Sequence, residues 1–136
     1  MKIAVRYYTR SGNTKKLAES IAEAVGVKAL PIIQPLTENV DILFLGSSVY
    51  ASGVAADVKK FIASIDCSIG TIINFSTAAK SKSTYERVKK LADEKGIKMS
   101  EKEYHCLGSY GQRNKGKPDK NDLQNAAIFA KEIVQY

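Results

Sequence analysis

The stretch YYTRSGNT near the amino terminus places short polar side chains between an apolar run and a helical pattern. Thr9, Ser11, Asn13 and Thr14 offer hydroxyl and amide groups, and Gly12 allows a left-handed backbone. A helix that begins near Asn13 leaves N–H groups without intrahelical partners, and its dipole favours an anion at that end. The stretch therefore predicts a phosphate-binding turn, with ordinary helix capping as the alternative.

Two other kinds of phosphate-binding turn do not fit this chain. The sequence contains no GxxxxGK[ST] motif, and its first turn is not GxGxxG, which excludes a P-loop nucleotidase and a dinucleotide-binding fold. No acidic cluster at the strand ends suggests a receiver domain. The remaining candidate ligand is a mononucleotide.

Three short apolar runs, at 3–8, 42–47 and 71–75, have the composition of buried parallel strands. Each is followed by apolar residues at helical spacing, and the pattern after the second run is the most regular. Its members are Val54, Ala55, Val58, Phe61, Ile62 and Ile65. The alternation predicts strand–helix units that build a parallel sheet.

Glycines and polar residues mark the ends of the other helices. Gly26 is placed to end the first helix, and Gly96 the third. Ser83 and Glu86 have the spacing of a capping box at the start of that third helix. A last helix is expected after Asp119.

Two weaker strands complete the sheet. Residues 27–32 include Pro31, which places this strand at a sheet edge with at most a short helical turn after it, and residues 97–107 form the last strand. We therefore expect a doubly wound α/β fold with a five-stranded parallel sheet of order 2-1-3-4-5, over one domain of residues 1–136. Ligands of such sheets bind at the switch point beyond the carboxyl ends of strands 1 and 3. The loops 8–14, 47–53 and 76–82 should converge there.

Composition narrows the functional classes. With 136 residues the chain is long enough for one compact core, and no apolar run reaches the ~20 residues of a membrane span. No signal-peptide pattern is found, so the expected location is the cytoplasm. Cys67, Cys106 and His105 form neither a disulfide framework nor a zinc cluster. Cys106 is interpreted as a packing residue, with a redox thiol as the alternative.

The net charge of +7 is concentrated in two segments. Residues 77–98 hold seven basic and three acidic side chains, and residues 112–120 hold four and one. The basic segments contain no aromatic RNA-binding signature and no helix-turn-helix spacing. Nucleic acid is therefore disfavoured as a partner. Recognition of an anionic partner and a merely solvated surface both remain open.

Three segments resemble the flavodoxin family. TRSGNT resembles the family's [TS]xxGNT phosphate-binding fingerprint, and GSSVYASGVAADVKKFI, residues 46–62, resembles its second flavin loop and the helix that follows. CLGSYGQRNKGKPDKNDLQNAAIFAKEI resembles the C-terminal segment of small flavodoxin-like proteins. The resemblance covers essentially the whole chain. It implies non-covalently bound FMN that passes through three oxidation states.

The resemblance also implies a set of cofactor-binding residues and roles for them. These residues are Thr9, Arg10, Ser11, Gly12, Asn13, Thr14, Ser48, Val49, Tyr50, Ala51, Ser52, Gly53, Ser76, Thr77, Ala78, Ala79 and Lys80. The first loop would hold the phosphate through side-chain and backbone groups, and Tyr50 would lie against the flavin ring. Ser52 and Gly53 would offer a flexible peptide near flavin N5. Residues 76–79 would present backbone groups to the pyrimidine edge of the ring.

Three functions are compatible with this site. An FMN-binding electron-transfer protein is the leading hypothesis. The alternatives are an FMN-dependent oxidoreductase acting on a quinone or similar acceptor, and an activating or binding module for a partner enzyme. Arg10, Lys80 and Lys82 depart from the acidic surface of typical flavodoxins, so we expect a less reducing flavin and favour an acidic redox partner. The oligomeric state is left open.

Overall fold

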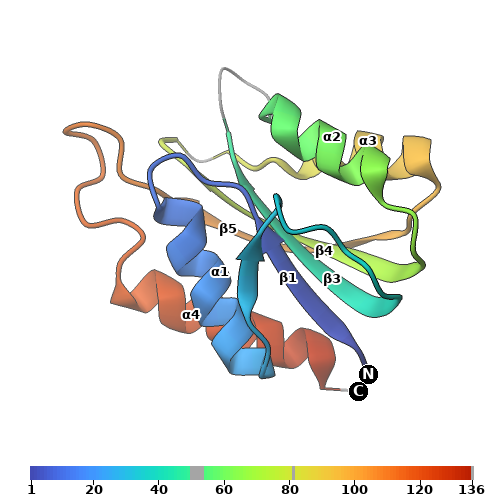
Figure 1. Ribbon diagram of the computed structural model, residues 1–136. Coiled ribbons are helices and arrows are strands. Elements are labelled where there is room, and N and C mark those ends of the chain that lie inside the picture. Colours follow the sequence, from blue (N-terminus) through green and yellow to red (C-terminus); the bar gives the residue numbers. More distant parts are fainter. Residues whose placement is uncertain (50–53, 81, 136) are drawn as a thin grey trace.

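A single parallel sheet with helices on both faces forms the molecule (Figure 1). The computed structural model describes residues 1–49, 54–80 and 82–135. Its strands are β1 (Ile3–Tyr7), β2 (Ala29–Pro31), β3 (Val40–Ser48), β4 (Ile69–Ala78) and β5 (Met99–Leu107). Its helices are α1 (Asn13–Val25), α2 (Ala56–Ser64), α3 (Tyr85–Lys95) and α4 (Lys120–Val134). All four strand pairs are parallel, and the order β2-β1-β3-β4-β5 confirms the predicted topology.

Side chains of the central strands alternate between two hydrophobic cores, as the pleat of a strand requires. Phe44 of β3 and Phe75 of β4 pack toward α1 and α4. Their neighbours Leu43, Leu45 and Ile72 pack toward α2 and α3. Burial on both faces explains why these strands read as continuous apolar runs.

The crossover from β2 to β3 is unusually short. Residues 32–39, all of them described, contain no helix, only a turn in which the Gln34 N–H donates to the Pro31 carbonyl at 2.9 Å. The edge position of β2 and the turn after it were both predicted from the prolines. As a result, no crossover helix covers this edge of the sheet on the α2 side.

The helix ends follow the predicted signals at three places and depart at one. Gly26 and Gly96 end α1 and α3 in the left-handed region, each with φ 76°. Asp119 caps α4 in a capping box with Asp122. The predicted capping box of Ser83 and Glu86 is wrong, because the capping position before α3 is Thr84, whose side chain makes no capping hydrogen bond. Ser83 Oγ still accepts from the N–H of Tyr85, the first residue of the helix, at 3.0 Å. The Ser83 hydroxyl itself donates to the carboxylate of Glu103 on β5.

Within the described ranges, no helix is long and apolar enough to cross a membrane.

Candidate functional site

The turn between β1 and α1 has the conformation that its sequence predicts. Gly12 precedes the first helical residue with φ 91° and ψ −4°, and its N–H donates to Thr9 Oγ1 at 2.9 Å. A Cβ atom built on Gly12 would meet nothing within 4 Å, so the backbone angle and not crowding requires glycine here. The N–H groups in the first turn of α1 have no intrahelical partners, as at any helix start.

Thr14 fixes the start of α1 to the sheet. Its side chain is fully buried, and its Oγ1 lies 2.6 Å from Ser48 Oγ and 2.9 Å from Thr77 Oγ1. The Ser48 and Thr77 hydroxyls are 3.2 Å apart, so the three groups close a triangle between α1, β3 and β4. Because this hydroxyl is engaged, Thr14 offers an anion its backbone N–H.

Asn13 connects the same turn to the segment after β5. Its Nδ2 donates to the Ser109 carbonyl at 2.9 Å, and the Ser109 hydroxyl donates to Asn13 Oδ1 at 3.3 Å. Gly108 permits this approach, since a Cβ there would lie 2.8 Å from Asn13 Nδ2. Ser109 was not among the predicted site residues, although Gly108 beside it was a readable turn signal.

Two adjoining cavities open at the carboxyl ends of the strands. The polar hollow, of about 250 Å³, is lined by Ser11, Asn13, Ser48, Val49, Thr77, Ala78, Ala79, Gly108, Ser109 and Tyr110. The basic hollow, of about 570 Å³, is lined by Val49, Ala78, Ala79, Lys80, Lys82, Tyr110, Gly111, Gln112 and Arg113. The two hollows share Val49, Ala78, Ala79 and Tyr110 and therefore form one continuous site.

Alternation along β4 decides which of its predicted residues face the site. Thr77 points toward Thr14, whereas the buried Ser76 points to the opposite face of the sheet. There the Thr84 N–H approaches Ser76 Oγ at 3.4 Å, and the Ser76 hydroxyl approaches Ser83 Oγ at the same distance. Residue 76 can therefore serve the site only through its backbone.

The remaining predicted residues lie at the rim or outside the described part of the chain. Arg10 is exposed and donates from Nε to the Tyr8 hydroxyl at 3.3 Å. Lys80 is exposed on the wall of the basic hollow. Tyr50, Ala51, Ser52 and Gly53 lie outside the described residues. Their assignments, like the ligand-holding roles of the other site residues, stay predictions.

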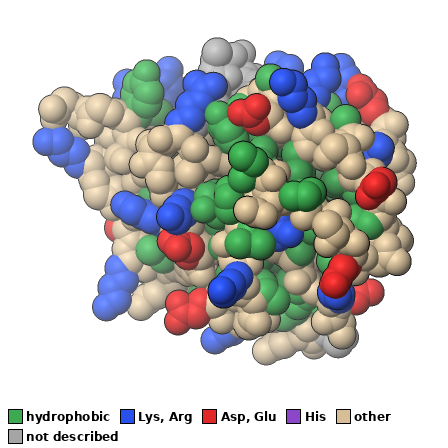
Figure 2. Space-filling view, in the orientation of Figure 1, with side chains coloured by type: hydrophobic (Ala, Val, Ile, Leu, Met, Phe, Trp, Pro, Cys, Tyr) green, Lys and Arg blue, Asp and Glu red, His purple; other side chains and the backbone are tan. Residues whose placement is uncertain are grey.

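The site carries positive charge. Lys80, Lys82 and Arg113 line the basic hollow, and no carboxylate lies among the described residues of either hollow. Figure 2 shows Lys and Arg side chains along the edge of the molecule near this site and on the projecting segment between β5 and α4. The arrangement favours an anionic ligand or partner.

Burial makes Cys106 a packing residue. This half-buried side chain packs against the core beneath α1 and α4, and burial raises the pKa of its thiol to about 12. A thiol with that pKa stays protonated at neutral pH and is a poor nucleophile. Among the described residues, no group of three or more His, Cys, Asp or Glu side chains could hold a metal ion.

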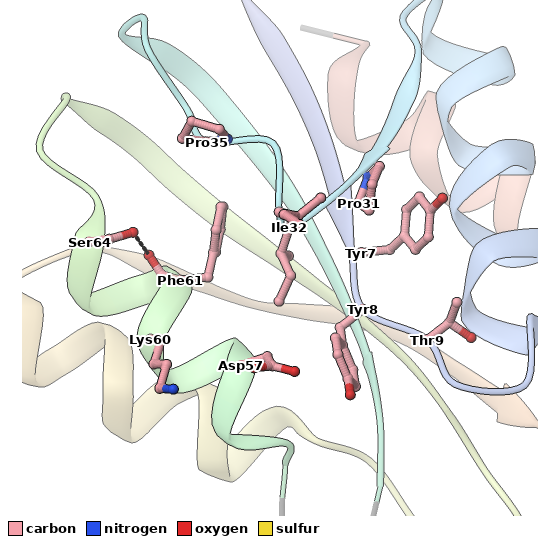
Figure 3. A pocket seen from close by; sticks show the side chains of 11 residues that line it. Tyr7, Tyr8, Thr9, Pro31, Ile32, Pro35, Asp57, Lys60, Phe61 and Ser64 are labelled. Atoms are coloured by element: carbon pink, nitrogen blue, oxygen red, sulfur yellow. Dashed lines mark hydrogen bonds between the residues drawn. The ribbon is translucent and has the colours of Figure 1, made fainter.

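A third cavity, the side groove, lies on the α2 face where the crossover helix is missing. Its volume is about 710 Å³. In Figure 3, Ile32 lies between Phe61 of α2 and Pro31 of β2, while Asp57 and Lys60 lie along the same helix. The groove is larger than either hollow, but of the predicted phosphate-binding residues Thr9–Thr14 it contacts only Thr9. The hollows are therefore the better candidate for the functional site.

Fold and site together define a doubly wound α/β protein with an anion-binding helix start at the switch point of its sheet. The Flavodoxin domain matches residues 4–108, and this chain belongs to that family. Membership supports a flavin as the cofactor in general terms.

One relative and two solved structures are similar to this chain over nearly its whole length. The chain is 30% identical to the uncharacterized protein MJ0298 of Methanocaldococcus jannaschii, with 90% of this chain and 91% of that protein covered. A flavodoxin from the domain Archaea has a similar structure, with a TM-score of 0.76 at 18% identity over 99% of this chain and 97% of the other. Oxidised flavodoxin 1 of Bacillus cereus gives 0.71 at 17% identity over 100% and 99%. These two structures support the fold alone.

Proposed function

We propose that this protein binds FMN non-covalently and carries electrons between other proteins in the cytoplasm. The observation that carries the proposal is the start of α1, where the left-handed Gly12 precedes the helix and its neighbours Ser11 and Asn13 line the polar hollow. An FMN phosphate would bind to the N–H groups in the first turn of α1 and to the hydroxyls of Thr9 and Ser11. Helix starts of this kind favour a phosphate because its charge complements the helix dipole.

The two hollows suit the other parts of FMN. The polar hollow offers the Asn13 and Ser109 groups and the ends of β3 and β4 to the ribityl chain. The basic hollow is wider and offers apolar walls at Val49, Ala78 and Ala79 to the ring. FMN, when bound, supplies a ring that accepts and releases electrons one or two at a time. The chain's own contribution is to hold this ring at the surface, where a partner can approach it.

An acidic protein is the proposed redox partner. The positive charge around the hollows would attract such a partner and repel a basic one. Measured transfer rates that fall as salt rises would support this choice, whereas rates that rise with salt would contradict it.

Titration of the apoprotein with FMN and with riboflavin tests the cofactor proposal. We expect FMN to bind with one molecule per chain and riboflavin to bind at least tenfold more weakly. Riboflavin lacks the phosphate, and one charge-assisted hydrogen bond is worth about 1.5–3 kcal/mol. A folded protein that ignores FMN at high micromolar concentration would disprove the proposal. Equal affinities for the two flavins would disprove the role of the turn.

Turnover with NAD(P)H and a quinone tests the carrier role. We expect no direct oxidation of NAD(P)H by the FMN-loaded protein and rapid reduction by a protein donor. Sustained NAD(P)H oxidation would instead favour the oxidoreductase alternative.

A further inference from the structure

Tyr110 lies at the junction of the two hollows. It lines both cavities and is the only aromatic residue among their described lining residues. The residue is 75% exposed, and within the described ranges only Met1, Ile33 and Ile128 are other large apolar residues that are exposed. An aromatic side chain thus lies where the wider hollow meets the narrower one.

The backbone around Tyr110 is fixed by hydrogen bonds. The Tyr110 N–H donates to the Arg113 carbonyl and the Arg113 N–H donates back to the Tyr110 carbonyl, both at 2.9 Å. Gly111 within this tight turn and Asn114 directly after it have left-handed φ angles of 58° and 54°. Tyr110 therefore lies in a turn whose backbone is held by hydrogen bonds.

Asn114 attaches the turn to the sheet. Its Nδ2 donates to the Ala79 carbonyl at 2.8 Å and to the Gly108 carbonyl at 3.2 Å. The same half-buried amide thus holds the segment after β4 and the segment after β5 together. This connection holds the segment that carries Tyr110 next to Ala79, which lines the basic hollow.

The side chains that line the basic hollow suit a flat ring with an electron-rich edge. One wall is apolar, through Val49, Ala78 and Ala79, and Tyr110 stands at its border with the polar hollow. Lys80, Lys82 and Arg113 add positive charge at the periphery. Aromatic rings gain stacking energy beyond the area they bury when they lie face to face with an offset or edge to face.

We propose that Tyr110 covers the flavin ring in the basic hollow and that Asn114 is the positioning residue that holds it there. The inference rests on the proposed function and adds a wall of the site that comes from the segment between β5 and α4. The segment 76–80 carries no aromatic residue, so Tyr110 provides the ring contact that this segment does not.

Fluorescence titrations of the apoprotein with FMN test the proposal. The variants are Tyr110→Leu, Tyr110→Phe and Asn114→Ala, with Ile33→Ser as a matched control because Ile33 is an 83% exposed apolar residue away from both hollows. We expect Tyr110→Leu to raise the Kd for FMN about 3- to 10-fold and to leave the bound flavin more fluorescent. Tyr110→Phe should retain wild-type quenching, and Asn114→Ala should show part of the Tyr110→Leu effect.

The outcomes separate this inference from the proposed function. If wild type binds FMN and Tyr110→Leu has the same Kd and the same quenching, the inference about Tyr110 is wrong, and the proposed FMN site is unaffected. If Tyr110→Phe behaves like Tyr110→Leu, a hydroxyl contact replaces stacking and the inference is also wrong. If folded wild type fails to bind FMN, the proposed function fails first. Far-ultraviolet circular dichroism of each variant checks that it is folded.

Discussion

The hydroxyl of Thr14 has two hydrogen-bond partners, and because all three groups are buried, water cannot take its place. Changing Thr14 to Val keeps the shape of the side chain but leaves Ser48 Oγ and Thr77 Oγ1 with one partner fewer. We expect this variant to lose about 1–3 kcal/mol of unfolding free energy, the usual cost of an incompletely satisfied buried polar group. Urea denaturation measures it. Thr37→Val, at an exposed position, is the control, and an equal loss in both variants would contradict the role of the triangle.

The thiol of Cys106 provides a pH-dependent test. Burial raises its pKa to about 12, so the reactive thiolate is scarce at pH 8 and increases only at strongly alkaline pH. We expect Cys106 in a Cys67→Ser variant to react with iodoacetamide at least tenfold more slowly at pH 8 than an unhindered thiol with the ordinary pKa of about 8.5. Peptide mass spectrometry measures the rate. Fast modification at pH 7 would restore the redox-thiol alternative.

At the scale of elements, the two ends of α1 offer a matched pair of glycines. Gly12 and Gly26 are both left-handed, and a Cβ at either would meet open space. Alanine at each position should therefore cost a similar free energy of unfolding, about 1–2 kcal/mol, through backbone strain alone. Urea denaturation of both variants checks this equality.

Ligand binding should distinguish the two variants. Gly12→Ala disturbs the N–H groups that face the predicted phosphate, so we expect its Kd for FMN to rise about tenfold or more, the value of one charge-assisted hydrogen bond. Gly26→Ala, at the far end of the helix, should leave the Kd unchanged. Calorimetric titration measures both. Equal Kd values would mean that the start of α1 does not hold the phosphate.

The elements that sequence predicted best were those whose signals are local. Apolar runs located β1, β3 and β4, and Gly26 and Gly96 located two helix ends, because burial and left-handed backbone angles are properties of the positions themselves. The role of Ser83 in a capping box was predicted wrongly. Its hydroxyl donates to Glu103 on β5, a partner that no local pattern reveals. The same limit applies to Ser109 and Tyr110, which reach the site only because β5 ends beside α1 and β4.

The alternation of the sheet explains a further limit at the site. The motif at the end of β4 is continuous in sequence, yet Thr77 and Ser76 face opposite layers of the molecule. A contiguous list of site residues therefore mixes side chains that face the hollows with others that only contribute backbone. Only the register of the strands separates the two groups.

For the whole molecule, charge at one edge of the sheet is the property with the widest consequence. The net charge of +7 is distributed so that three cations line the basic hollow while the described lining residues include no carboxylate. Reduction adds negative charge to a bound flavin, and nearby cations stabilise that charge. A lysine at ~8 Å in an effective dielectric of ~20 contributes about 2 kcal/mol before screening.

The reduction potential should therefore depend on where lysines lie and not on net charge alone. We expect the double variant Lys80→Gln, Lys82→Gln to have a midpoint more negative by about 50 to 90 mV for each lysine at low salt, with a smaller shift as salt rises. Lys28→Gln, Lys98→Gln changes net charge equally, but these residues precede β2 and β5 and so lie at the opposite end of the sheet. Spectroelectrochemical titration measures both variants. If the midpoints of both variants equal that of wild type, the lysines of the basic hollow do not shift the reduction potential of the flavin. Partner recognition is then the proposed role of their charge.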